Sequence, residues 1–164
     1  DLICHGTGIS EKGIEMLLKK GIYILPTLAS PNPEPEPHIV NAKSSRVVEL
    51  LKETGRLQWE SIKRAYQAGV KMALSTDAGG VGIKHGENAK EMLRMRQMGM
   101  SNLECLRAAT SEAAKAMKFT DVGRVETGMK ADLVILKENP LEHLETVLDV
   151  EGVLKKGRFI KGIA

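Results

Sequence analysis

The hydrophobic positions in the first part of the chain alternate between short apolar runs and longer stretches of helical period. Residues 2–4, 22–25 and 70–74 are short, mostly apolar runs, the second and third of them preceded by glycine, which is typical of buried strands. Between and after them, apolar residues recur every three or four positions, which predicts helices. The predicted helices cover residues 10–20, 41–68, 87–98, 102–109 and 111–117. A strand, a helix and a strand joined by short links form a βαβ unit, so we predict an α/β fold with parallel strands.

The ends of the predicted helices carry recognisable signals. Ser10 is a suitable N-cap for the first helix, and Gly21 supplies its C-terminal stop. Ser101 and Glu104 have the spacing of a capping box, which predicts that a helix begins there. Gly55 lies inside the longest helical pattern and could break it into two helices.

The pattern changes after Phe119 to short strands without helices. A segment that contains several glycines precedes the predicted strands, which cover residues 131–136, 147–155 and 158–160. A run of short strands of this kind is typical of a separate β layer. We therefore predict a boundary near residue 120, between the segments 1–119 and 120–164.

The composition is that of an ordinary globular protein of 164 residues, with 42% hydrophobic and 27% charged residues. The net charge is +3, and the basic residues are scattered along the chain. Aromatic residues make up only 3%, which leaves few stacking platforms, so we do not expect binding to nucleic acid. No run approaches the ~18 apolar residues of a membrane span, so no membrane partner is expected either.

Two further features concern the cysteines and the start of the chain. Cys4 and Cys105 lie in apolar patterns and are expected to be reduced and buried, although the sequence does not exclude their pairing. The chain begins at Asp1, inside a predicted strand and without an initiator methionine, and we interpret it as a piece of a longer protein. The localisation therefore stays undetermined, with a weak preference for the cytoplasm.

Two side chains that bind metals well follow predicted strands. His5 comes directly after the first strand, and Asp77 ends the third, where Gly79 and Gly80 allow close approach. Because the carboxyl ends of parallel strands share one edge, these side chains could meet there as metal ligands, or Asp77 could act as a general base. The alternative is that Asp77 caps a turn or helix and that His5 is an ordinary polar residue.

Other polar candidates lie in the loops. Residues 30–37 hold four of the six prolines and form either a surface linker or a lid over the strand ends. His38 lies in this loop, and His85 follows the glycines after Asp77, where it could contact a substrate. His143 is expected at the surface.

Four motifs carry a resemblance to a known family. They are His5-Gly6-Thr7-Gly8, Ser75-Thr76-Asp77-Ala78-Gly79, Ala109-Thr110-Ser111-Glu112-Ala113-Ala114 and the stretch from Gly123 to Val134. Together they resemble the C-terminal part of the metal-dependent amidohydrolase superfamily, in the branch of imidazolonepropionase-like and Xaa-Pro dipeptidase-like enzymes. The resemblance implies a partial (β/α)8 TIM-type barrel, comprising the last three βα units in 1–119, followed by C-terminal strands of a small β-sandwich in 120–164.

The resemblance also implies roles for individual residues. His5 would match the metal-ligand histidine of the family's sixth strand. Asp77 would match the aspartate of the eighth, which binds metal and serves as general base toward the hydrolytic water. The implied cofactor is a divalent metal, zinc by preference, as one or two ions. The family's other ligands have no counterpart here and would lie upstream of Asp1.

The resulting hypothesis is a fragment of a hydrolase that cleaves C–N bonds in a small-molecule, dipeptide-like or cyclic amide substrate. The fragment alone is expected to be inactive, and to self-associate or pair with the missing N-terminal part, because uncovered parallel edges are unfavourable. A non-enzymatic, self-associating half-barrel with relic site residues is the alternative from another class. A deaminase of the same superfamily is the nearer rival. The substrate, the metal identity and number, and the oligomeric state of the complete protein cannot be read from this chain.

Overall fold

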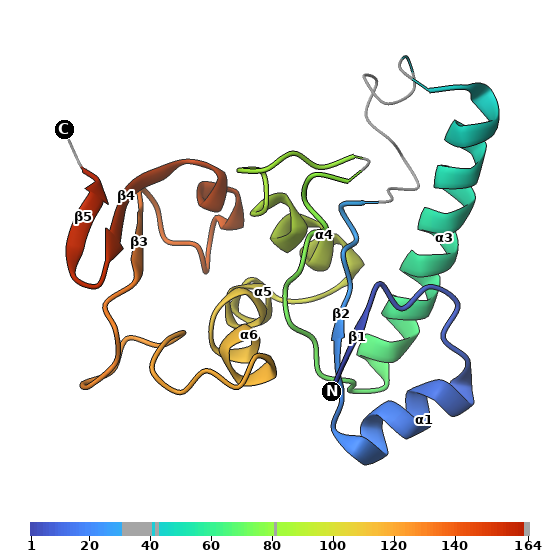
Figure 1. Ribbon diagram of the computed structural model, residues 1–164, viewed down its shortest axis with the longest axis horizontal. Helices are drawn as coiled ribbons and strands as arrows, with labels where there is room; N and C mark the ends of the chain where they lie inside the picture. Colours follow the sequence, from blue (N-terminus) through green and yellow to red (C-terminus); the bar gives the residue numbers. More distant parts are fainter. Residues whose placement is uncertain (31–40, 42, 81, 163–164) are drawn as a thin grey trace.

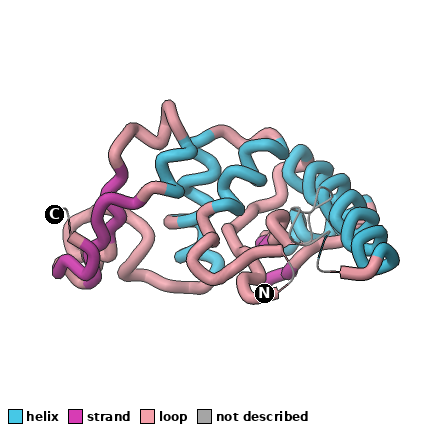
Figure 2. The backbone as a smooth tube through the Cα atoms, turned by 90° about the horizontal axis from the view of Figure 1, so that it is seen from above, coloured by secondary structure: helices cyan, strands magenta, loops and turns pink. Residues whose placement is uncertain are grey.

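A computed structural model describes residues 1–30, 41, 43–80 and 82–162. The molecule is elongated, with the parallel strands and the longest helix toward one end and the C-terminal strands at the other (Figures 1 and 2). The proline-rich residues 31–37 and His38 lie outside the described residues, so the choice between linker and lid stays open.

The N-terminal part forms the predicted parallel βαβ unit. Strand β1 (Leu2–Cys4) pairs in parallel with β2 (Tyr23–Leu25), and helix α1 (Glu11–Lys20) connects them. The third predicted strand also runs parallel to β2, but it forms a single bridge, between Ile24 and Met72. Its Ala73 N–H donates to the carbonyl of Ile24 at 3.0 Å, and on its other side the N–H of Leu74 donates to the carbonyl of Ala108 at 2.9 Å.

The end signals of α1 are confirmed. The Ser10 side chain accepts from the N–H of Gly13 at 3.2 Å. Gly21 adopts a left-handed conformation with φ of 63°, which glycine accommodates without strain, and its N–H closes the last turn.

Helix α3 (Ser45–Gln67) is continuous over 23 residues, so the break that Gly55 could have introduced does not occur. A glycine inside a helix costs only about 1 kcal/mol relative to alanine. That cost is offset here because the helix buries an apolar stripe that includes Val48, Ile62 and Ala65.

Three short helices follow: α4 (Lys90–Met98), α5 (Asn102–Ala109) and α6 (Ser111–Ala116). The capping box at the start of α5 is confirmed, since the Ser101 and Glu104 side chains each bind the other's backbone N–H. None of the helices in the described part of the chain is both long and apolar enough to span a membrane.

The two cysteines differ from each other. Both are free thiols, and Cys105 is buried in the core as expected. Cys4 is exposed, so its predicted burial is wrong. The reason is that β1 pairs with β2 on one side, while no other described strand covers its opposite edge.

The C-terminal part contains an antiparallel sheet in the order β3-β4-β5. Its strands are β3 (Leu133–Leu136), β4 (Val150–Lys155) and β5 (Arg158–Lys161). The predicted strand 147–155 begins late, because a 3-10 helix, η1 (Leu144–Leu148), precedes it and places its buried side chains against the main core. The β4–β5 turn at Lys156-Gly157 has positive φ at both residues, as a two-residue hairpin turn of type I′ requires.

Candidate functional site

His5 is the first residue beyond β1. Its N–H still donates to the carbonyl of Leu25 at 2.9 Å, so the residue stays tied to β2. The side chain is exposed, and its Nδ1 lies 2.8 Å from Oγ1 of the buried Thr27. One ring nitrogen is thus engaged by the protein. Nε2 has no hydrogen-bond partner among the described residues.

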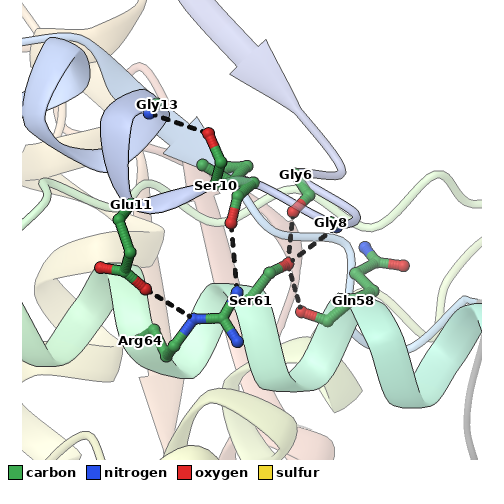
Figure 3. Close-up of polar contacts among 9 residues, drawn as sticks. Gly6, Gly8, Ser10, Glu11, Gly13, Gln58, Ser61 and Arg64 are labelled. Carbon is green, nitrogen blue, oxygen red and sulfur yellow. Dashed lines mark hydrogen bonds and ion pairs between the residues drawn. The ribbon is translucent and has the colours of Figure 1, made fainter.

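The turn after His5 is held on one face of α3 (Figure 3). The Ser61 hydroxyl donates to the carbonyl of Gly6 at 2.6 Å and accepts from the N–H of Gly8 at 3.1 Å. A Cβ at Gly6 would lie 2.6 Å from Cδ1 of Ile62, and the φ of Gly6 is +70°. Glycine is therefore required for this close contact, and α3 sets the position from which His5 projects.

A second pair of contacts holds the far end of the same turn. Arg64, one helical turn beyond Ser61, donates to the carbonyl of Ile9 at 3.2 Å and pairs with Glu11 at 3.4 Å (Figure 3). The Arg64 side chain of that ion pair is about half exposed and the Glu11 side chain is largely exposed, so the pair contributes little on its own. Its effect is to help fix the direction of the turn.

Asp77 ends the segment that lies beside β2 on the side opposite to β1. It is exposed and has a positive φ of 53°, which is uncommon for a residue other than glycine. Its carbonyl accepts from the N–H of Gly80 at 3.1 Å. A Cβ placed on Gly80 would lie 3.3 Å from Oδ2 of Asp77, so the carboxylate lies against this glycine.

His85 lies at the same glycine turn. A Cβ added to Gly79 would come within 2.7 Å of its Nε2, so the exposed ring lies over this glycine. The ring of His85 and the carboxylate of Asp77 thus both border the Gly79-Gly80 turn. His143, by contrast, is exposed next to η1, as expected.

The strand directions place His5 and Asp77 along one edge. Strand β1 and the segment around Met72 both pair in parallel with β2, so the carboxyl ends of all three point the same way. An imidazole and a carboxylate are the donor types that zinc uses. Within residues 1–30, 41, 43–80 and 82–162, however, no group of three or more His, Cys, Asp or Glu gathers as a metal site would require. The described chain therefore fits part of a metal site, not a whole one, and the roles of His5, Asp77 and His85 stay predictions.

Glu91 is a buried carboxylate that sequence reasoning missed. It is fully buried on α4, and its two oxygens accept from the N–H groups of Leu28 and Ala29, both at 2.7 Å. Burial raises the pKa of Glu91 to about 7, against the lowering effect of these two hydrogen bonds and of Arg94. The bonds fix the segment that directly follows Thr27, and so support the partner of His5.

A signal for Glu91 was present in the sequence. It precedes Met95 by four positions and Met98 by seven, so it shares their helix face. Both methionines are buried in the core. A glutamate on such a face is buried and needs donors, although the pattern does not say which donors.

Comparison with known proteins identifies the family. Residues 4–160 match the amidohydrolase family, and the chain belongs to it. It is 37% identical over 90 residues to an imidazolonepropionase of Streptomyces griseus, covering 54% of this chain and 23% of that protein. The crystal structure of a Xaa-Pro dipeptidase with bound methionine is similar with a TM-score of 0.85 and 29% identity, covering 99% of this chain and 40% of that one. The resemblance to these two kinds of enzyme is thereby confirmed.

A further relative shows how much of a related protein this chain covers. An uncharacterised protein of Mycobacterium tuberculosis is 28% identical over 162 residues, which is 96% of this chain but 42% of the relative. The chain thus spans less than half the length of the relatives it matches.

Proposed function

We propose that this chain is the C-terminal part of a metal-dependent hydrolase that cleaves C–N bonds. The observation that carries the proposal is that His5 and Asp77 follow two parallel segments that flank β2, whose carboxyl ends point the same way, inside the segment that matches the amidohydrolase family. The two kinds of similar enzyme, a Xaa-Pro dipeptidase and an imidazolonepropionase, point to an amide, dipeptide-like or cyclic amide substrate.

The proposed chemistry gives each residue a distinct role. A divalent metal, zinc by preference, would lower the pKa of a water molecule at this edge and polarise the substrate carbonyl. His5 would hold the ion through Nε2, since Nδ1 lies 2.8 Å from the Thr27 hydroxyl. Asp77 would hold the same ion and would accept the proton of the hydrolytic water. His85 lies over Gly79 within reach of the same turn and contacts the substrate.

The fold supports a larger assembly. In this proposal the three parallel segments with their helices are the last units of a (β/α)8 barrel, and β3, β4 and β5 belong to an accessory sandwich. The complete site then needs ligands from the rest of the barrel, and the chain alone is inactive.

Metal content tests the proposal. The complete protein that contains this chain is expected to retain at least one divalent ion per molecule after dialysis, measured by elemental analysis. The His5→Ala variant is expected to lose metal, whereas His143→Ala, at an exposed histidine beside η1, should keep it. A complete protein without metal would favour the scaffold alternative. Release of ammonia from a substrate ring that otherwise stays intact would favour a deaminase.

The second expectation concerns the association of the chain through the uncovered edge of β1. Beside β1 lies an apolar groove of about 390 Å³, and Ile3 and Met16 on it are 39% and 50% exposed. Parallel strands are normally covered on both sides. We therefore expect the isolated chain to self-associate, or to bind the missing N-terminal part when both are present. Light scattering at several concentrations checks this, and a monomer at every concentration that also ignores the N-terminal part would contradict it.

A further inference from the structure

Thr27 occupies an unusual position behind His5. It is 1% exposed and has a positive φ of 50°, which a β-branched residue rarely adopts. Its hydroxyl oxygen lies 2.8 Å from Nδ1 of His5. A strained backbone at a strand end persists where surrounding contacts hold it.

Gln58 supplies those contacts. From one buried turn of α3, its Nε2 donates to the carbonyls of His5 and Pro26 and to Oγ1 of Thr27; the first and last of these bonds measure 3.1 Å. The opposite amide orientation would set Oε1 against two carbonyl oxygens, so Nε2 must face them. Gln58 therefore ties the ends of β1 and β2 together and uses one of the two acceptor positions of the Thr27 hydroxyl.

The remaining acceptor position is what a metal-binding imidazole needs. If Nε2 of His5 binds a cation, the ring proton must be on Nδ1, and that N–H needs an acceptor. Oγ1 of Thr27 is the acceptor within reach. It is uncharged and can also donate, so it serves the ring in either tautomer.

We propose that Thr27, held by Gln58, is a positioning residue for His5: it fixes the ring orientation and accepts a hydrogen bond from Nδ1–H, so that Nε2 is free for a divalent cation. This inference rests on the proposed function. It concerns Thr27 and Gln58, to which the proposed function gives no role as metal ligands.

The test compares Thr27→Val with Thr27→Ser in the complete protein. Valine keeps the branched shape and removes the hydroxyl, whereas serine restores it. With Zn²⁺ as the probe and a competing chromophoric chelator, Thr27→Val is expected to bind about 10- to 100-fold more weakly than wild type. Thr27→Ser should stay close to wild type. Equal affinity of Thr27→Val and wild type would overturn the proposal.

A second readout does not depend on metal. With the His5 ring neutral, its ¹⁵N resonances should indicate a hydrogen-bonded Nδ1 in wild type and Thr27→Ser, and should shift to values typical of exposed histidine in Thr27→Val. Unchanged resonances in Thr27→Val would overturn the role of Thr27 even if wild type binds no metal. If wild type binds no metal but the His5 resonances shift in Thr27→Val as expected, the proposed function is refuted and the role of Thr27 stands. Gln58→Met, which keeps the side-chain length but removes the donor, should produce the same shift in smaller degree and serves if Thr27→Val fails to fold.

Discussion

Replacement of Asp77 by asparagine is expected to lower the rate of amide hydrolysis by the complete protein about 10²- to 10⁴-fold. The amide has the shape of the carboxylate but neither accepts a proton at neutral pH nor carries the charge that a cation requires. Because Asp77 is exposed at the end of its segment and its side chain lies against Gly80, the substitution should leave the fold intact. The rate is measured with a panel of Xaa-Pro dipeptides and cyclic amides, and the fold is checked by thermal unfolding.

The matched control is Asp149→Asn. Asp149 is also an exposed aspartate, but it precedes β4 and pairs with Lys137 at 2.6 Å. An exposed surface pair of this kind contributes little to stability, so its loss should leave hydrolysis unchanged. Equal rates in Asp77→Asn and Asp149→Asn would remove Asp77 from the mechanism.

The elements that local pattern determines could be predicted. Ser10, Gly21 and the Ser101 capping box act through neighbours three or four positions away, so their spacing alone indicates the helix ends. The parallel order of β1 and β2 followed from the short links around α1. The sequence left open whether Gly55 breaks its helix, because a local glycine penalty is small beside the packing of a long amphipathic helix.

The supporting contacts of the site could not be predicted because their partners are distant in sequence. Gln58 lies 53 positions from His5, and Glu91 lies 63 positions from Leu28. The sequence shows Gln58 only as a polar residue on a helix; it places Glu91 on the helix face of Met95 and Met98 but does not show which donors it meets. What makes each side chain part of the site is the tertiary packing of α3 and α4 against the strand ends.

Glu91→Gln is expected to lower the free energy of unfolding of the protein. In wild type each carboxyl oxygen of Glu91 accepts one backbone N–H, from Leu28 or Ala29. A glutamine keeps one acceptor but turns an NH₂ group toward the other N–H, leaving a buried donor unpaired. The loss of such a bond costs about 1–3 kcal/mol. Glu60→Gln, at an exposed position of α3, is the control and should change stability little.

The difference in the free energy of unfolding between wild type and Glu91→Gln should also depend on pH. Burial raises the pKa of Glu91 from 4.5 to about 7, so between these values the folded state keeps a proton that the unfolded state releases. The stability that this group contributes is therefore fully present below pH 4.5 and is lost as the pH rises through about 7, a change of up to roughly 3 kcal/mol.

Glutamine does not titrate, so urea unfolding across this range should show the advantage of wild type over Glu91→Gln shrinking as the pH increases. The carboxyl groups with lowered pKa, such as Glu104 and Glu112, are present in both proteins and cancel in the difference. If the difference in the free energy of unfolding stays constant or widens as the pH increases, Glu91 is ionised throughout this range. Its two hydrogen bonds from backbone N–H groups then lower its pKa by more than burial raises it.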